Sequence, residues 1–580
     1  MVFVRKESIL MIIVKGLGIS TGREIGVVHK IANVDFKMEN MRITLADADD
    51  EINKVTEAFS VASEQLTKIR DSSDDDDTRD IMSVHIEIAK DNAMRKKVEM
   101  LIREERYSAI DALYTSCEEF AQMLEDLNDE YMSQRAADIR DVCKRVYRAM
   151  IGVPDEQLDS PSIVVADDLT PSVLSSLNRD YVKAFVSGTG GKTSHIAIMA
   201  NGMGIPAAAG LGDEITKIHS GDTVIVDGKH GYVYVDPDEE TIEKFQEAKK
   251  LDKAEEEERN KFIGLPAKTL DGERRVEVCA NIAFIDECNN AKAVGAEGVG
   301  LYRTEFLYMD SNDWPTEEDQ FTAYKNVLET MAPNPVIIRT MDIGGDKALP
   351  YMEIEKEDNP FLGYRAVRIS LGNPQMFKTQ LRALLRASVY GRLRIMFPMI
   401  SNLRELREAK GYLDECRSEL LSEGVELADN VEVGIMIEIP AAAIMADKLA
   451  PEVDFFSIGT NDLIQYTMAA DRMNNKVAYL YDSLQPAVLN LIHNTIVAAH
   501  KYGKMVGMCG EMAGSEQSIK LLVGMGLDEF SMSAGSILRF KSIISKFKYS
   551  EAKSYAEECL NCATAEEVHS LVEEKGGVSK

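Results

Sequence analysis

A glycine-rich turn that ends in a histidine is the first feature of the sequence whose residues could do chemistry. The turn reads Gly-Gly-Lys-Thr-Ser-His over residues 190–195, and the apolar run Ile-Ala-Ile-Met-Ala follows it directly. Glycines let backbone N–H groups approach an anion, and the start of a helix adds partial positive charge. A neutral imidazole nitrogen in this place could accept a phosphoryl group as a covalent intermediate. His195 is therefore a candidate nucleophile, although a histidine near a helix start can also be a cap or a packed side chain.

A second set of candidate residues lies at or just after the ends of apolar runs in the C-terminal half. The set holds two arginines, two carboxylates, an amide and a thiol: Arg303, Arg339, Glu438, Asp462, Asn461 and Cys509. Arginine binds phosphate and carboxylate groups bidentately, and two carboxylates together with substrate oxygens suit Mg²⁺. The set therefore suits one small molecule with two anionic groups, bound together with Mg²⁺.

Each member of this set has a simpler explanation when it is taken alone. Arg and Glu side chains at a barrel rim often form structural salt bridges, and a cysteine on a strand is usually a small core residue. The members share a position, however, because all of them lie at or just after the C-terminal ends of predicted strands. Active sites of (β/α)8 barrels gather at the C-terminal ends of the strands, so the functional interpretation depends on the fold.

Eight near-continuous apolar runs, most of them separated by helix-like stretches, follow residue 266. The runs cover residues 276–282, 297–302, 336–341, 393–399, 431–439, 454–459, 505–510 and 528–533. Such runs are typical of parallel strands that are buried on both faces. Their number predicts a (β/α)8 barrel over residues 266–580. An open doubly wound sheet would need fewer strands and a glycine-rich phosphate fingerprint, which we do not find.

Two β-rich segments that are far apart in the sequence predict one discontinuous α/β domain, over residues 12–39 and 151–236. Residues 12–30 have the pattern of a β-hairpin or strand pair with glycine turns. β-Branched runs return after Pro154, with helix-like segments between them. The histidine turn lies in the second of these segments.

The segment between these two parts, residues 40–150, predicts an inserted all-helical bundle. Apolar residues from Ile52 to Ile69 recur every three or four positions, which is the helical period. Further helical stretches are expected at about 78–104, 107–133 and 134–150. After the second β-rich segment, the strongly charged residues 237–265 predict a solvent-exposed linker helix.

Composition narrows the class of protein and its location. The 580 residues include 97 acidic and 66 basic ones, for a net charge of -31. This balance argues against nucleic-acid binding, which needs clustered Lys and Arg. Eight scattered cysteines suggest reduced thiols, and no stretch approaches the ~20 apolar residues of a membrane span. We expect a cytoplasmic protein with no membrane or nucleic-acid partner.

The histidine motif resembles one that is shared by a family of phosphoenolpyruvate-using enzymes. The run GGKTSHIAIMANGMGIPAAAG is similar to the phosphohistidine motif of enzyme I of the bacterial sugar phosphotransferase system, pyruvate phosphate dikinase and phosphoenolpyruvate synthase. This resemblance implies that His195 carries the phosphoryl group. Lys192 stands where an arginine is common in the family. Val173 and Leu174 stand where many members have a threonine that orients the histidine, so the orienting group stays open.

Segments at the ends of the predicted barrel strands resemble the phosphoenolpyruvate-binding signatures of enzyme I. They read GAEGVGLYRTEFL, RTMDIGGDKALPY, NPFLGYRA, RIMFPMI, DFFSIGTNDLIQYT and GMCGEMAG. The resemblance implies a substrate site made of Arg303, Arg339, Arg365, Asn461, Asp462 and Arg472.

The same resemblance implies a metal site and a proton donor. Glu438 and Asp462 would ligate Mg²⁺, and Cys509 would protonate the methylene carbon as enolpyruvate becomes pyruvate. Ile439 stands where the family often has threonine, so the hydrogen bonds around Glu438 are expected to differ.

The helical insertion discriminates among the members of this family. The dikinase and the synthase carry an ATP-grasp domain before the histidine domain, for which this chain has no room. Enzyme I instead has a helical insertion that docks the histidine-containing phosphocarrier protein HPr, and residues 40–150 resemble it. The resemblance thus implies a phosphoenolpyruvate-protein phosphotransferase that serves sugar transport and dimerises through its barrel. The alternatives are a related phosphoenolpyruvate-utilising enzyme, or a non-catalytic HPr-binding regulator that would have lost the nucleophile or the metal carboxylates.

Overall fold

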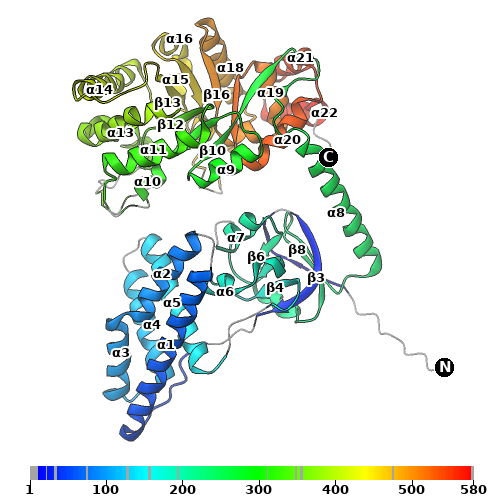
Figure 1. Cartoon of the computed structure of the whole chain (residues 1–580). Coiled ribbons are helices and arrows are strands. Elements are labelled where there is room, and N and C mark those ends of the chain that lie inside the picture. The colour runs from blue at the N-terminus through cyan, green and yellow to red at the C-terminus, as the bar shows by residue number, and fades with distance from the viewer. Residues whose placement is uncertain are drawn as a thin grey trace, which may run out of the picture. The chain divides into compact units, whose positions relative to one another are not determined.

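The structure is a computed structural model that divides the chain into two compact units, Met1–Ala254 and Glu255–Lys580 (Figure 1). It describes residues 11–20, 22–31, 36–72, 76–125, 130–153, 158–191, 195–309, 311, 313–345, 349, 351–352, 357–472, 474 and 476–576. Of the helices in these ranges, none has both the length and the apolar character that a membrane crossing requires.

An eight-stranded sheet forms the α/β part of the first unit. Its strands are β1 (Ile12–Lys15), β2 (Leu17–Ser20), β3 (Arg23–Lys30), β4 (Ser162–Ala166), β5 (Val182–Ser187), β6 (Ala207–Ala209), β7 (Thr223–Asp227) and β8 (Tyr232–Val235). Their spatial order is β1-β8-β7-β3-β4-β5-β6-β2, and β3, β4, β5 and β6 run parallel. The sheet therefore joins segments from both sides of the helical insertion.

The predicted hairpin or strand pair over residues 12–30 is wrong. Three strands form there, and in the described ladders β1 pairs with β8, β2 with β6, and β3 with β4 and β7. All of these partners come later in the chain than the insertion, so local pattern could not reveal them. A Cβ atom at Gly16 would lie 2.5 Å from the carbonyl oxygen of Ala209, so glycine allows the corner between β1 and β2 to approach β6 closely.

Alternating residues of β4 pack against opposite faces of this sheet, as the two-residue period of a strand requires. Val164 faces a core that includes the buried residues of α6 (Pro171–Ser176) and α7 (His195–Met203). Ile163 and Val165 face a second core with β7 and β8. Ile196, Ala197 and Ala200 anchor α7 in the first core and so position its first turn.

Five helices form the bundle between β3 and β4. They are α1 (Ala48–Ser72), α2 (Asp76–Lys90), α3 (Asn92–Arg103), α4 (Ala109–Glu125) and α5 (Glu130–Met150), packed around a core of their own. The predicted single stretch at 78–104 is broken, because Asp91 caps α3 by accepting a hydrogen bond from the Met94 amide at 2.8 Å. The predicted boundary at 133/134 is also wrong, since α5 begins at Glu130.

A long charged helix, α8 (Glu239–Asn260), follows β8. Its N-terminal part, as far as Asp252, packs on the sheet of the first unit, where Phe245 contacts Tyr234 and Asp252 pairs with Arg23. Most of its other side chains are exposed.

A closed barrel of eight parallel strands forms the second unit and confirms the predicted fold class. The strands are β10 (Arg275–Ile282), β11 (Val299–Arg303), β12 (Pro335–Arg339), β13 (Arg392–Phe397), β14 (Glu432–Ile437), β15 (Phe455–Ile458), β16 (Met505–Met508) and β17 (Glu529–Met532). They pair in chain order, and the pairing of β10 with both β11 and β17 closes the barrel. A short strand that was not predicted, β9 (Ala267–Lys268), pairs antiparallel with β10.

Helices surround this barrel (Figure 1). They are α9 (Asp286–Ala293), α10 (Glu305–Met309), α11 (Glu317–Met331), α12 (Val367–Gly372), α13 (Pro374–Ala387), α14 (Leu403–Ser422), α15 (Pro440–Ile444), α16 (Ala446–Leu449), α17 (Thr460–Met468), α18 (Pro486–Lys501), α19 (Glu516–Met525), α20 (Ala534–Ile544), α21 (Tyr549–Leu560) and α22 (Ala565–Lys575). The short helix α17 begins directly after β15 and carries Asn461 and Asp462 in its first turn.

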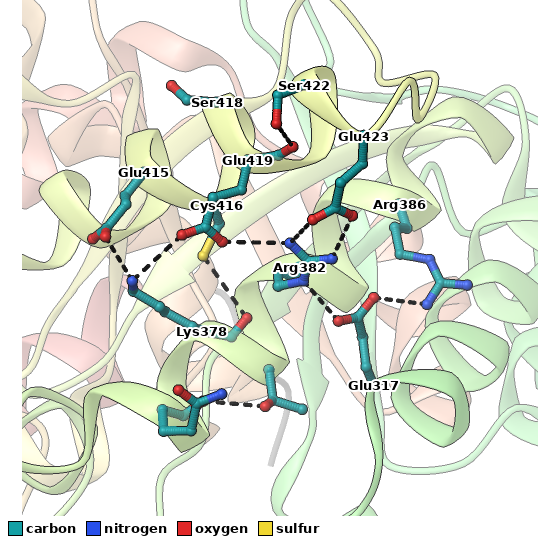
Figure 2. Close-up of polar contacts among 12 residues, drawn as sticks. Glu317, Lys378, Arg382, Arg386, Glu415, Cys416, Ser418, Glu419, Ser422 and Glu423 are labelled. Atoms are coloured by element: carbon teal, nitrogen blue, oxygen red, sulfur yellow. Dashed lines mark hydrogen bonds and ion pairs between the residues drawn. The ribbon is translucent and has the colours of Figure 1, made fainter.

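An ion-pair network joins three of these outer helices (Figure 2). Arg382 of α13 pairs with Glu317 of α11 at 2.8 Å and with Glu423, just after α14, at 2.8 Å. Lys378, one turn earlier on α13, pairs with Glu415 of α14 at 2.7 Å. The network holds α13 between its two neighbours on the outside of the barrel.

Candidate active site

Two arginines lie side by side at the C-terminal ends of adjacent barrel strands. Arg303 ends β11 and Arg339 ends β12, and the parallel register pairs one directly with the other. Side chains of residues in register point to the same face of a sheet, so both arginines share one end of the barrel. Arg339 is buried and Arg303 is half-buried.

Two carboxylates hold the Arg339 side chain. Its Nη2 lies 2.6 Å from Glu305 and its Nη1 lies 2.8 Å from Asp342. Burial by itself lowers the pKa of Arg339, but Asp342 and Glu305 raise it by more. The guanidinium is therefore a fixed cation in a water-poor place, which is a suitable partner for a phosphate group.

Arg365 also contacts Asp342, so it forms one charge cluster with Arg339, Glu305 and Asp342. Its Nη2 lies 3.0 Å from Asp342 and 3.4 Å from Asp462, and its Nη1 donates to the Tyr466 hydroxyl at 3.1 Å. A Cβ atom at Gly344, which has φ +105°, would lie 2.6 Å from the Arg365 Cβ. Glycine there allows the loop after β12 to pass close to Arg365.

Two carboxylates, Glu438 after β14 and Asp462 on α17, lie close enough to influence each other. Burial first, and then the charges of Asp462 and Asp342, raise the pKa of Glu438 above its ordinary value. The backbone N–H of Met399 donates to Glu438 at 2.5 Å, and Met399 holds a positive φ of 55°. Such strain at a buried polar contact is common at functional sites.

These two carboxylates fit a magnesium ion better than a cation that needs an all-protein cage. Among the described residues, no group of three or more His, Cys, Asp or Glu side chains is arranged to hold a metal. Asp462 Oδ1 is buried, and within the described ranges it has no hydrogen-bond partner. Mg²⁺ is commonly held by one or two carboxylates together with substrate oxygens and water. A cation between Glu438 and Asp462 would also relieve their mutual repulsion.

Cys509 lies just beyond the end of β16 and faces the inside of the barrel. Its side chain packs with Leu301, Ile337, Met436 and other apolar residues of the lumen. Burial raises the pKa of the Cys509 thiol to about 11, although Ser457 and Arg339 act to lower it. The thiol therefore keeps its proton at neutral pH and can act as an acid.

Asn461 and Arg472 lie at the edge of the charge cluster. Asn461 exchanges two long hydrogen bonds with Glu511, at 3.3 and 3.4 Å. The Arg472 backbone donates to Gln465 at 3.1 Å, and its guanidinium lies 5.8 Å from the centre of the Phe361 ring. Both side chains are half-buried.

A cavity of about 510 Å³ opens beside this cluster. Its lining includes Phe361, Met399, Ile439 and Tyr466. Ile439, which departs from the family pattern, therefore presents an apolar wall next to Glu438.

His195 is the first residue of α7, in the other unit of the chain. Its side chain and residues 192–194 lie outside the described part of the structure, so the predicted anion turn and the orienting group are not tested. The backbone position, at the start of a nine-residue helix, is the one predicted.

Three members of the cluster were missed in the sequence. Glu305 and Asp342 each come two or three residues after a predicted arginine, and Tyr466 lies one turn after Asp462. A signal was present, because all three fall within the segments that resemble enzyme I. Acidic residues after a strand are, however, often solvated turn residues, so spacing alone does not select them.

Three family models match the chain. A model described as "PEP-utilising enzyme, PEP-binding domain" covers residues 256–549, and "PEP-utilising enzyme, N-terminal" covers 15–135. "PEP-utilising enzyme, mobile domain" covers 158–231, which includes His195. The barrel with its charge cluster, together with these matches, defines a phosphoenolpyruvate-utilising class of enzyme.

Relatives that match almost the whole chain show to which family within this class of enzymes it belongs. Phosphoenolpyruvate-protein phosphotransferases from Bacillus subtilis and Staphylococcus carnosus are 48% and 46% identical, over 97% of this chain and 99% and 98% of their own lengths. The protein of the same name from Geobacillus stearothermophilus is 48% identical over 96% of this chain and 97% of its own. The chain belongs to the phosphoenolpyruvate-protein phosphotransferase family.

Proposed function

We propose that this enzyme transfers the phosphoryl group of phosphoenolpyruvate to His195 and then to the phosphocarrier protein HPr, and releases pyruvate. This is the first step of a sugar phosphotransferase system. The observation that carries the proposal is the gathering of fixed cations, paired carboxylates and a protonated thiol at one end of the barrel. A substrate with a phosphate, a carboxylate and a carbon that must gain a proton needs these groups together.

The anionic groups of the substrate would be bound by the arginines of the cluster. Arg303 and Arg339 lie next to each other and suit the phosphate, while Asn461, Arg472 and Arg365 complete the pocket. Arg339 and Arg365 are already oriented by carboxylates, so little side-chain entropy is lost when the substrate binds. Fixed cations also stabilise the charge that spreads over a phosphoryl group during transfer.

Glu438 and Asp462 would hold Mg²⁺, with Asp462 also facing the substrate pocket. When bound, the ion would neutralise charge on the phosphoryl oxygens. Within the described residues the Oδ1 of Asp462 has no hydrogen-bond partner, and the ion would relieve the repulsion from Asp462 that contributes to the raised pKa of Glu438.

Cys509 would act as the general acid. As the phosphoryl group leaves, the enolate carbon C3 takes the Sγ proton, the C2–O bond becomes a carbonyl, and pyruvate forms. A thiol with a pKa of about 11 holds this proton until a strong carbon base is generated beside it.

His195 would be the nucleophile at the start of α7, where the helix N-terminus favours a phosphorylated imidazole. Because His195 and the barrel cluster belong to different units, the proposal requires the units to meet and part in each cycle. The helices α1–α5, with their own core, would dock HPr.

The proposal extends to a homodimer formed by the barrel and to a cytoplasmic location. All eight cysteines are free thiols, which supports a reducing compartment.

Pyruvate production with and without HPr tests this function. Without HPr, the chain with phosphoenolpyruvate and Mg²⁺ should release about one pyruvate per chain and stop, because His195 is filled. Excess HPr should make pyruvate production continuous. No pyruvate in either case would favour a non-catalytic HPr-binding regulator, and continuous production without HPr would favour another phosphoenolpyruvate-utilising enzyme.

A further inference from the structure

A buried glutamine on α13 contacts both of the strand ends that carry the paired arginines. Gln380 is fully buried, and its Oε1 accepts a hydrogen bond from the backbone N–H of Met341 at 3.0 Å. Its Nε2 donates to the Thr304 hydroxyl at 3.4 Å. Met341 lies two residues after Arg339, and Thr304 directly follows Arg303. One amide group therefore links the end of β11 to the end of β12.

The Thr304 hydroxyl closes this link. It is fully buried and donates to the backbone carbonyl of Arg339 at 2.8 Å. Because the hydroxyl gives its only proton to Arg339, its oxygen is left to accept from the amide of Gln380. The backbone N–H of Met341 can only donate, so the Gln380 atom that faces it must be the oxygen. The direction of every hydrogen bond in the link is therefore fixed.

The two linked segments carry four charged groups of the cluster. One segment holds Arg303 and Glu305, and the other holds Arg339 and Asp342. Glu305 and Asp342 both pair with the Arg339 side chain. A shift of one strand end relative to the other would therefore change the spacing of all four groups.

Two tyrosines and a second glutamine extend the link into a larger buried network. Gln380 Nε2 also donates to the Tyr324 hydroxyl at 3.1 Å. The hydroxyls of Tyr324 and Tyr308 both donate to Gln320 Oε1 at 3.0 Å, and Gln320 Nε2 donates to the carbonyl of Pro315 at 3.0 Å. Every polar atom of the two glutamine side chains thus has a partner. A buried polar network that is fully satisfied makes its surroundings rigid.

Stability alone does not explain a glutamine at this position. The other buried residues of α13 are apolar: Phe377, Leu381, Ala383, Leu384, Leu385 and Ala387. Replacing both partners of a buried hydrogen bond by apolar groups of the same shape can be nearly neutral for stability. The amide of Gln380 is therefore best explained by the geometry that its hydrogen bonds impose on the strand ends.

The helix that carries Gln380 is also held from its outer side. Arg382, two residues further along α13, pairs with Glu317 of α11 and with Glu423 just after α14 (Figure 2). On the inner side, Gln380 bonds to Tyr324 of α11. Because α11 and α13 are joined on both sides, the amide is a fixed point against which the strand ends are held.

We propose that Gln380 and Thr304 are positioning residues that set the spacing of Arg303 and Arg339 for phosphoryl transfer. This inference rests on the proposed function, in which the two arginines bind the phosphate of phosphoenolpyruvate. Gln380 and Thr304 act through the backbone of the strand ends and make no contact with the substrate.

Misplaced arginines should slow the transfer more than they weaken binding. The attraction between a guanidinium and a phosphate falls slowly with distance, so a small shift changes the affinity little. Transfer in line depends on the orientation of the reacting groups, and a small misplacement can lower its rate strongly. Loss of the link should therefore lower kcat and leave the KM for phosphoenolpyruvate close to that of wild type.

Single-turnover phosphorylation of His195 separates positioning from a loss of folded protein. Thr304→Val keeps the shape of the side chain and removes only the hydroxyl. With Mg²⁺ and phosphoenolpyruvate that carries a radiolabelled phosphoryl group, this variant should reach the same amount of label per chain as wild type, but about tenfold more slowly. Thr304→Ser keeps the hydroxyl and should restore most of the rate. A variant that only folds poorly would instead carry less label, formed at the wild-type rate.

Gln380→Met provides the second variant, since methionine has a similar length but cannot replace the amide. It should also be slow with a full amount of label, and the double variant with Thr304→Val should be no slower than the slower single one, because both act on one link. Tyr308→Phe is the matched control. It removes a hydroxyl of the same network that bonds to Gln320, and it should phosphorylate His195 at the wild-type rate.

A wild-type rate in Thr304→Val, or a loss confined to its amount of label, would overturn the inference, whether or not Gln380→Met folds. Because wild type would be phosphorylated in that experiment, the proposed function would stand. Absence of label on the wild-type chain would instead contradict the proposed function, and the inference with it.

Discussion

At one end of the barrel, some side chains carry a fixed positive charge, and another keeps its proton at neutral pH. Arg339 and Arg365 are held by carboxylates, whereas the Cys509 thiol has a pKa raised by burial and keeps its proton at neutral pH. Fixed cations suit substrate binding, and protonated groups suit proton delivery. The two properties come from one cause, the exclusion of water from the strand ends.

The acid role of Cys509 leads to the first prediction. Cys509→Ala should lower steady-state pyruvate formation by about 100-fold, because general acid catalysis is lost, while phosphorylation of His195 proceeds. In D₂O, the deuterium delivered to the pyruvate methyl group can be followed by NMR. Cys288→Ala, a buried thiol on α9, is the control and should behave as wild type. Wild-type turnover in Cys509→Ala would contradict the assignment.

The buried position of Glu529 leads to a prediction for stability. A carboxyl whose pKa rises from 4.5 to about 8 on folding keeps a proton that the unfolded chain loses, so stability falls as pH rises through this window. Glu529→Gln removes this cost. Between pH 5 and pH 8, the free energy of unfolding of the variant should therefore rise relative to that of wild type. The upper limit of this rise is about 4 kcal/mol, at ~1.4 kcal/mol per pH unit.

Urea unfolding of both proteins at the two pH values measures this gain. Glu273→Gln, on an exposed turn before β10, is the control and should show no such pH-dependent gain. A constant difference between Glu529→Gln and wild type across the pH range would show that Glu529 is ionised in the folded protein.

The sequence could predict some of these residues but not others, for a physical reason. Arg303, Arg339, Glu438 and Cys509 follow recognisable buried strands, so their shared location could be inferred from topology. Glu529 is the second residue of the predicted run 528–533, and nothing local indicates that its carboxyl group faces the lumen. Its environment is made by Gly300 and Gly507, which lie on other strands.

Helices and strands were predicted best where burial alone decides them. All eight barrel strands were found, because strands buried on both faces are apolar throughout. The strands over residues 12–30 were mispaired, since their partners lie beyond the helical insertion. β6 is three alanines and lacks β-branched residues, so no strand propensity marks it.

The network around α13 yields a prediction at the scale of elements. Arg382→Ala should lower the free energy of unfolding of the barrel by about 1 kcal/mol, because it removes contacts to both α11 and α14 (Figure 2). High salt should shrink the difference from wild type. Arg407→Ala, which breaks one exposed pair with Glu452, is the control and should cost clearly less than Arg382→Ala. Equal costs for the two variants would show that the network adds nothing beyond single pairs.

The division of the whole molecule into separately packed parts yields a further prediction. Deleting residues 40–150 should abolish transfer to HPr but spare pyruvate formation, since α1–α5 have their own core. β3 and β4 are adjacent parallel strands. After the deletion, the roughly 20 residues that remain between them can reach from the end of β3 back to the start of β4, at ~3.3 Å per residue. Stoichiometric pyruvate release and HPr phosphorylation are measured side by side. Wild-type phosphorylation of HPr by the deletion variant would contradict the docking role.

The central claim is that a histidine on one unit takes the phosphoryl group of a substrate bound by the other. The most direct test is incubation of the full chain with Mg²⁺ and phosphoenolpyruvate that carries a radiolabelled phosphoryl group. We predict about one acid-labile, base-stable label per chain, absent in His195→Ala and retained in Cys509→Ala. A label of the same chemistry and amount in His195→Ala would contradict the account.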